Sequence, residues 1–134
     1  MGQTVVWIED DIYIIGSIVE PLEKAGVTVA KFRSLREALD NIETIRSSQL
    51  IVLDVLMPLD ESRNGTRYGG LGFVEALKAA GIAVPLVILT VVTNPEVREK
   101  LAALGVDPEN ILRKPILPSV LKEHVLRVLG TSKA

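Results

Sequence analysis

Short runs of aliphatic and β-branched residues alternate along this chain with stretches whose apolar residues recur at helical spacing. Each run predicts a strand, and together they cover residues 4–8, 27–32, 50–53, 85–90 and 111–113. A helical pattern follows every run, and no segment repeats another. Strands that alternate with helices indicate βαβ units, which build a parallel sheet covered on both faces. We therefore predict an α/β fold, a doubly wound sandwich around a five-stranded parallel sheet.

The helical segments carry their own start and stop signals. Gly26 and Gly105 follow predicted helices at the position where a glycine commonly ends one. Ser34 and Glu37 form a capping box. We expect one helix to follow this box, with an apolar face of Leu35, Leu39, Ile42 and Ile45. In the next helix, the residues expected to face inward are Phe73, Ala76, Leu77 and Ala80.

Composition agrees with one compact domain. The chain has 134 residues, enough to bury a single hydrophobic core. Hydrophobic residues make up 48% of it but aromatic residues only 4%, so the core must be aliphatic, as in parallel sheets covered on both faces. We predict a single domain over residues 1–134, without an output domain, interrupted by an extended loop over 55–70.

Charge and composition exclude several functional classes. Fifteen Lys and Arg against seventeen Asp and Glu give a net charge of −2, which is not the basic footprint of a nucleic-acid-binding protein. No apolar run approaches the roughly 18–20 residues of a membrane span, and the N-terminus has no secretion signal. The absence of cysteine excludes disulfides and thiolate metal sites. We expect a cytoplasmic protein that binds neither nucleic acid nor a membrane directly.

Polar residues stand where the predicted strands end: Glu9, Asp10, Asp54, Thr90 and Lys114. Ligands of doubly wound sheets bind at this edge, outside the carboxyl ends of the strands. Carboxylates from two strand ends would repel each other there, and a hard cation such as Mg²⁺ relieves that repulsion. A carboxylate nucleophile, a divalent metal, a lysine and a hydroxyl together make a site for phosphoryl transfer.

These residues resemble, over essentially the whole chain, the receiver domain of two-component response regulators. The matching positions are Glu9-Asp10, Leu53-Asp54, Met57-Pro58, Thr90 and Lys114-Pro115, each in its expected place after a strand. The resemblance implies a flavodoxin-like (βα)5 sandwich. It also implies that the chain accepts a phosphoryl group from a histidine kinase or phosphotransfer protein and signals by protein–protein contact, as a signalling module and not a turnover enzyme.

The resemblance implies a role for each acidic residue. Asp54 would be the phosphoacceptor, whose carboxylate attacks phosphorus in line. Asp10 would bind Mg²⁺, or Mn²⁺ in its place, directly, and Glu9 would act through water. Asp54 itself and the backbone carbonyl of Leu56 would complete the protein's share of the metal site.

Three further positions follow from the resemblance. Thr90 would hydrogen-bond the phosphoryl group and move when it arrives. Lys114 would pair with Asp54 before the reaction and with a phosphoryl oxygen after it. The peptide bond between Lys114 and Pro115 would be cis, and cis bonds are essentially a proline feature.

The chain departs from the usual receiver pattern at two switch or access positions and in one loop. Val91 follows Thr90 where receivers usually carry a very small residue. Ile111 stands where they usually carry a tyrosine or phenylalanine whose ring moves on activation. The loop after Met57-Pro58 is also long, with residues 59–69 before Gly70; it is either a plain insertion or a lid or kinase-docking element.

Each functional residue also has a simpler interpretation. Asp54 could cap a turn, and Asp10 and Asp11 could serve as acids at a helix N-terminus. Thr90 could be an ordinary strand residue, and Lys114 a solvated one. His124, at the margin of an apolar helical face, fits a boundary residue better than a catalytic base.

Among other functions, a phosphatase of the haloacid dehalogenase type would need a second aspartate where Leu56 stands. A Rossmann cofactor site would need a glycine-rich turn after the first strand, where the chain has acids. The remaining alternative is a receiver-like binding module that works without phosphorylation, which Val91 and Ile111 favour. The retained acidic pair, acceptor, threonine and lysine argue against it.

The bulk of Val91 predicts restricted access to the phosphoryl group and therefore slow dephosphorylation. Replacing Val91 with alanine should accelerate the loss of phosphate. Following the decay of the phosphorylated protein by intact mass tests this, and equal decay rates for the two proteins would refute it.

Overall fold

The computed structural model describes residues 3–9, 12–54, 69–90 and 95–130 of the chain. Neighbouring strands run parallel in one five-stranded sheet of order β2-β1-β3-β4-β5. The strands are β1 (Thr4–Ile8), β2 (Thr28–Phe32), β3 (Leu50–Leu53), β4 (Leu86–Thr90) and β5 (Ile111–Arg113). The predicted five-stranded, doubly wound sheet is confirmed, with its switch in strand order between β1 and β3.

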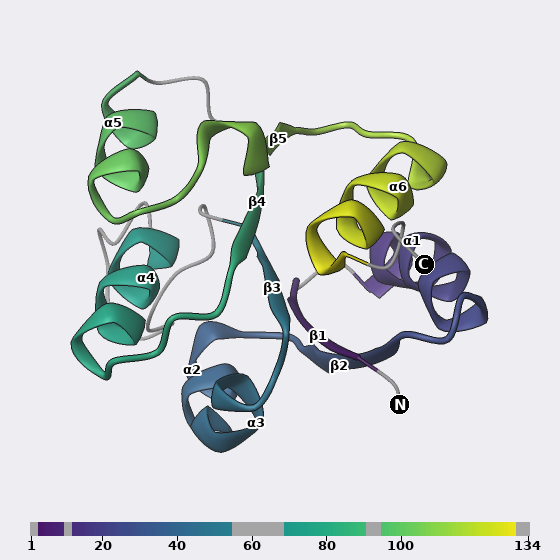
Figure 1. Cartoon of the computed structure of the whole chain (residues 1–134), viewed down its shortest axis with the longest axis horizontal. Coiled ribbons are helices and arrows are strands. Elements are labelled where there is room, and N and C mark those ends of the chain that lie inside the picture. Colours follow the sequence, from purple (N-terminus) through teal and green to yellow (C-terminus); the bar gives the residue numbers. More distant parts are fainter. Residues whose placement is uncertain (1–2, 10–11, 55–68, 91–94, 131–134) are drawn as a thin grey trace.

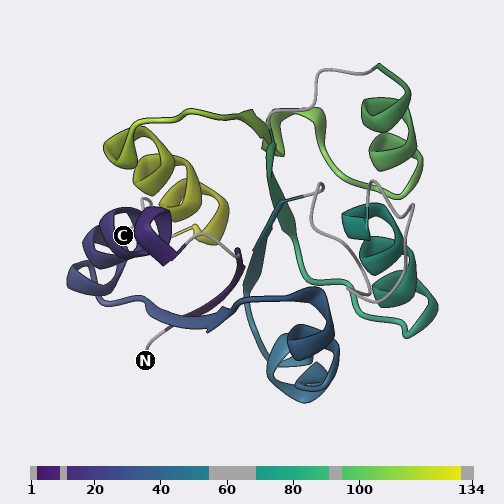
Figure 2. The same ribbon diagram turned by 180° about the vertical axis from the view of Figure 1, so that it is seen from behind.

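The helices form a layer on each face of the sheet (Figures 1 and 2). They are α1 (Ile12–Lys24), α2 (Leu35–Leu39), α3 (Ile42–Arg46), α4 (Gly69–Ala79), α5 (Pro95–Ala103), the 3₁₀ helix η1 (Pro108–Asn110) and α6 (Pro118–Leu129). α1 and α6 lie together on one face, and α2 to α5 cover the other. Within the described ranges, none of these helices has both the length and the apolar character needed to span a bilayer.

Alternate residues of the strands supply the two halves of the core. On β1, Val6 and Ile8 pack toward α2 to α5, whereas Val5 and Trp7 pack toward α1 and α6. All four side chains are at most 1% exposed, because a central parallel strand is covered on both faces. The four residues of β3, Leu50–Leu53, are buried in the same way.

The register of the sheet aligns one apolar row across four strands. Ile8 pairs with Leu53, Leu53 with Ile88, and Ile88 with Ile111. All four side chains belong to the half of the core under α2 to α5. The row includes the last residues of β1 and β3, so the residues that follow Ile8 and Leu53 emerge at one edge of the sheet.

The single helix predicted after Ser34 is instead two short helices, α2 and α3. Half of the capping box forms, since Ser34 Oγ accepts a hydrogen bond from the Glu37 backbone N–H at 3.0 Å. The Glu37 carboxylate accepts from the Arg33 backbone N–H at 2.8 Å, one residue before the N-cap. The side chain of Asn41 then donates to the Glu37 carbonyl at 2.8 Å, and the Asn41 backbone N–H bonds instead to the Ala38 carbonyl. An asparagine that takes over a backbone acceptor in this way interrupts a helix.

The inward face predicted for α4 is partly wrong. Its buried residues are Gly69, Gly70, Leu71, Phe73, Val74 and Leu77. Ala76 and Ala80 are exposed instead. Val74 takes the inward place because burying a large aliphatic side chain gains more free energy than burying a methyl group.

Several element boundaries differ from prediction by one or two residues. β2 starts after Val27, whose N–H bonds to Leu22 at the end of α1. β4 starts after Pro85, which has no N–H for the sheet. α4 begins at Gly69, so the loop expected over 55–70 is shorter, and its residues 55–68 lie outside the described ranges.

Two leucines offer a matched test of this core. Leu101 of α5 is fully buried, whereas Leu117 is 67% exposed. Leu101→Ala should lower the free energy of unfolding by about 2–5 kcal/mol, because it removes buried methyl groups and leaves a cavity. Leu117→Ala should change it by less than about 0.5 kcal/mol. Denaturant unfolding measures both, and similar losses in the two variants would contradict the packing described.

Candidate functional site at the carboxyl edge of the sheet

The sheet register brings two acidic residues to the same edge. Ile8 and Leu53 are direct partners on neighbouring strands, so Glu9 and Asp54, which follow them, leave the sheet side by side. The Glu9 backbone N–H also donates to the Phe32 carbonyl at 3.0 Å, which extends the pairing of β1 with β2 by one residue. The predicted convergence of carboxylates from the first and third strands is therefore present for Glu9 and Asp54.

Lys114, which follows the edge strand β5, contacts both of these acids. Thr90 pairs with Arg113 at the end of β4 and β5, and the Lys114 N–H donates to the Thr90 carbonyl at 3.0 Å. The Lys114 side chain lies 3.0 Å from Asp54 Oδ2 and 3.1 Å from Glu9 Oε1, measured from Nζ. One ammonium group thus bonds to both carboxylates.

This cluster is largely withdrawn from water. The side chains of Glu9, Asp54 and Lys114 are 3%, 12% and 16% exposed. Burial, the largest single influence, lowers the pKa of the Lys114 ammonium. The hydrogen bond and charge of Asp54, followed by those of Glu9, outweigh it, so that the pKa lies above its usual value of 10.5. Lys114 therefore stays protonated at neutral pH and offsets the charge of the two acids.

Thr90 and Pro115 border the same edge. Thr90 is the last residue of β4 and is only 3% exposed. Its backbone carbonyl accepts the hydrogen bond from the Lys114 N–H. The peptide bond between Lys114 and Pro115 is cis, the isomer that the resemblance implied.

Three of the expected site residues, Asp10, Leu56 and Val91, lie outside the described ranges. Ile111 is half-buried and packs against the core under α2 to α5. His124, half-buried on α6, lies with Nε2 2.8 Å from Asn110 Oδ1. Burial and the charge of Arg127 lower the pKa of His124, which suits a structural boundary residue.

Sequence reasoning missed the direct contact between Glu9 and Lys114. It assigned Glu9 to the metal through water and paired Lys114 with Asp54 only. The pattern of strands and helices does not reveal the contact, because the strand order and register decide which strand ends meet. A lysine after the fifth strand can reach the first only across the intervening β4 and β3.

The donor set fits a small hard cation. Mg²⁺ binds one or two carboxylates and completes its shell with water and phosphate oxygens, and Glu9 and Asp54 offer such a pair. No group of three or more His, Cys, Asp or Glu that could hold a metal gathers within the described ranges. A carboxylate pair with a lysine and a threonine at one edge matches the needs of phosphoryl transfer, which rests on positioning and charge.

Comparison with known proteins identifies a matching family and similar structures. The family model of the response regulator receiver domain matches residues 5–126. The structure is similar to the chemotaxis response regulator CheY4 of Vibrio cholerae, with 28% identity, a TM-score of 0.74 and coverage of 96% of this chain and 99% of that one. A search of curated proteins gives no match.

Two further structures share the fold. The receiver domain of the Francisella response regulator 1452 has 24% identity and a TM-score of 0.77, covering 97% of this chain and 98% of that one. A CheY-like receiver domain protein from Methanospirillum hungatei has 20% identity and a TM-score of 0.80, covering 99% and 98%.

Removal of the lysine charge should expose the repulsion that it offsets. Lys114→Met leaves two largely buried carboxylates without their cation, so we expect a loss of roughly 3 kcal/mol in the free energy of unfolding at pH 7 in metal-free buffer. Because the folded pKa of Lys114 is raised, its contribution is fully present below about pH 10.5 and is lost as the pH rises further.

The difference between wild type and Lys114→Met should therefore shrink above this pH. Denaturant unfolding from pH 7 to 11 measures it. Lys24→Met, which removes a lysine that is 77% exposed, is the matched control and should cost less than about 0.5 kcal/mol. Equal effects of the two variants would show that Lys114 does not offset buried charge.

Proposed function

This chain belongs to the response regulator receiver domain family, and from that membership we propose that it accepts a phosphoryl group on Asp54 in two-component signalling. The observation that carries the proposal is the Lys114 ammonium held between Asp54 and Glu9 at the strand ends. Receivers are generally signalling modules and not turnover enzymes, and here the acceptor is the protein's own side chain.

The reaction moves one phosphoryl group between two proteins. A carboxylate oxygen of Asp54 attacks the phosphorus in line and forms an acyl phosphate, while the bond from phosphorus to the donor's histidine nitrogen breaks. The Lys114 ammonium then turns from Asp54 to a phosphoryl oxygen. The Thr90 hydroxyl donates to another of these oxygens.

A divalent cation fits this scheme. Mg²⁺, or Mn²⁺ in its place, would supply charge neutralisation at the phosphoryl oxygens when bound. Asp10 would bind it directly, together with Asp54 and the Leu56 carbonyl, and Glu9 would act through water. Because Glu9 also bonds to Lys114, this acid links the metal position to the lysine that stabilises the phosphoryl group.

The proposed partners follow from the chemistry. The donor is a histidine kinase or a phosphotransfer protein, and the output is protein–protein contact in the cytoplasm. Ile111 has no aromatic ring that could move together with Thr90. A partner protein would therefore detect phosphorylation through α5 or through the segment between Thr90 and α5.

The alternative is a binding module that keeps the receiver fold and works without phosphorylation. Ile111 favours it, since its half-buried aliphatic side chain packs on the core and cannot act as an aromatic switch. Retention of Glu9, Asp54 and Lys114 argues against it. Clustered charges in a largely buried site carry a desolvation cost, and a module that works without phosphorylation has no use for them.

Intact mass after incubation with a small-molecule phosphodonor and Mg²⁺ tests the proposal. Wild type should gain the mass of one phosphoryl group. Asp54→Ala should gain none, and EDTA should abolish the gain in wild type. Asp40→Ala is the matched control, because Asp40 is an exposed acid on the surface of the helical layer, and it should be phosphorylated like wild type.

The outcomes separate the two functions. A gain that survives Asp54→Ala would place the acceptor elsewhere and refute the assignment. No gain in a folded wild-type protein would favour the binding module, whose partner a pull-down with the unmodified protein would then identify.

A further inference from the structure

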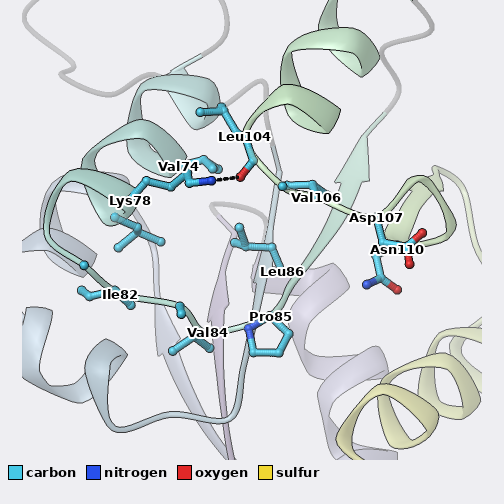
Figure 3. Close-up of a pocket in the computed structure, with 14 residues that line it drawn as sticks. Val74, Lys78, Ile82, Val84, Pro85, Leu86, Leu104, Val106, Asp107 and Asn110 are labelled. Carbon is cyan, nitrogen blue, oxygen red and sulfur yellow. Dashed lines mark hydrogen bonds between the residues drawn. The ribbon is translucent and has the colours of Figure 1, made fainter.

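A hollow opens at the opposite edge of the sheet from the phosphorylation site. It lies between the end of α4, the start of β4 and the segment after α5 (Figure 3). Its volume is about 450 Å³, within the roughly 300–1,000 Å³ typical of small-molecule sites. The hollow begins near Pro85 and Leu86, whereas the phosphorylation site lies beyond Thr90 at the other end of the same strand.

The walls of this hollow are mainly aliphatic. Apolar side chains from α4, the α4–β4 connection, β4 and the segment after α5 form them: Val74, Leu77, Ile82, Val84, Leu86 and Val106. Most of these residues are already buried, but Val84 and Leu86, together with Leu104 in the same lining, are only half-buried. An apolar ligand body that contacts these three side chains removes apolar surface from water.

Lys78 supplies the positive charge in the lining. Its ammonium group donates to the Leu104 carbonyl at 2.9 Å (Figure 3). An ammonium has three donors, and this is the one hydrogen bond that Lys78 makes within the described ranges. Two donors therefore remain for a ligand.

Several acceptors at or near the hollow already accept a hydrogen bond. The Leu77 carbonyl at the end of α4 accepts from the Ile82 N–H at 3.0 Å, and the Leu101 carbonyl in α5 accepts from the Val106 N–H at 2.9 Å. Asp107, the one acid in the lining, accepts from the Glu109 N–H at 2.9 Å. The Asp107 carboxylate keeps further acceptor sites, so Lys78 is the feature of the lining that selects a ligand with an anionic acceptor.

The charges of Lys78 and Asp107 determine how such a ligand is oriented in the hollow. Lys78 and Asp107 border different parts of the hollow (Figure 3). An anionic group is attracted to the ammonium and repelled by the carboxylate, and hydrogen bonds between ammonium and carboxylate groups are stronger than neutral ones. An anionic group should therefore lie against Lys78, with the ligand's apolar part over the aliphatic walls.

We propose that this hollow binds a small monocarboxylate with an apolar body, whose carboxylate bonds to Lys78. The proposal does not depend on phosphorylation of Asp54. It assigns to the end of α4, the start of β4 and the segment after α5 a ligand site separate from the phosphoacceptor.

Titration of the ¹⁵N-labelled full chain with hexanoate tests the proposal by amide NMR shifts. The amides of Ile82, Val84 and Val106 should shift and saturate, with a Kd on the order of millimolar for so small a ligand. Acetate, which lacks the apolar body, and hexanamide, which lacks the charge, should each bind at least fivefold more weakly.

Two variants of Lys78 and one control complete the test. Lys78→Met and Lys78→Gln should both weaken hexanoate binding at least fivefold, and Lys78→Gln retains a hydrogen-bond donor if the apolar substitution disturbs folding. Lys24→Met, at the last turn of α1 on the other face of the sheet, should bind like wild type. Absence of saturable shifts in wild type, or unchanged binding in a folded Lys78 variant, would overturn the proposal.

Discussion

The ammonium group of Lys114 lies between two carboxylates that would otherwise face each other at the edge of a largely apolar sheet. Its hydrogen bonds to Asp54 and Glu9 are 3.0 and 3.1 Å long, and none of the three side chains is more than 16% exposed. Acidic groups gathered this closely carry a cost in the free energy of folding unless a cation accompanies them. The same accumulation of charge is what the proposed phosphoryl transfer to Asp54 requires, so the proposed function and the electrostatic cost arise from the same side chains.

The parallel register is what brings these groups together. β1 and β3 are direct neighbours at the switch in strand order, and the pairing of Ile8 with Leu53 sends the next residue of each chain to the same place. An aliphatic row beneath them, buried in β1, β3 and β4 and half-buried in β5, favours that register. A slip by one residue would turn each side chain to the other half of the core. Mobile loops are not needed to assemble Glu9, Asp54 and Lys114, since each directly follows a strand.

The strands and their polar ends could be predicted from the sequence, because buried aliphatic runs and the residues that end them are local signals. The interruption between α2 and α3 at Asn41 could not be predicted. It depends on whether the Asn41 side-chain amide bonds to the Glu37 carbonyl or to water. The inward face of α4 was misassigned at Ala76 because periodicity does not weigh a methyl group against a larger neighbour such as Val74. The bond between Glu9 and Lys114 depends on strand order, which no local pattern contains.

In the proposed reaction, Lys114 leaves Asp54 and pairs with a phosphoryl oxygen, while Asp54 stays at the end of β3. A crystal structure with Mg²⁺ and beryllofluoride, a mimic of the phosphoryl group, tests this most directly. We predict beryllium bonded to a carboxylate oxygen of Asp54 and Lys114 Nζ within hydrogen-bonding distance of a fluorine. Beryllofluoride on another side chain, or its absence with the Lys114–Asp54 pair unchanged, would contradict the proposed roles of Asp54 and Lys114.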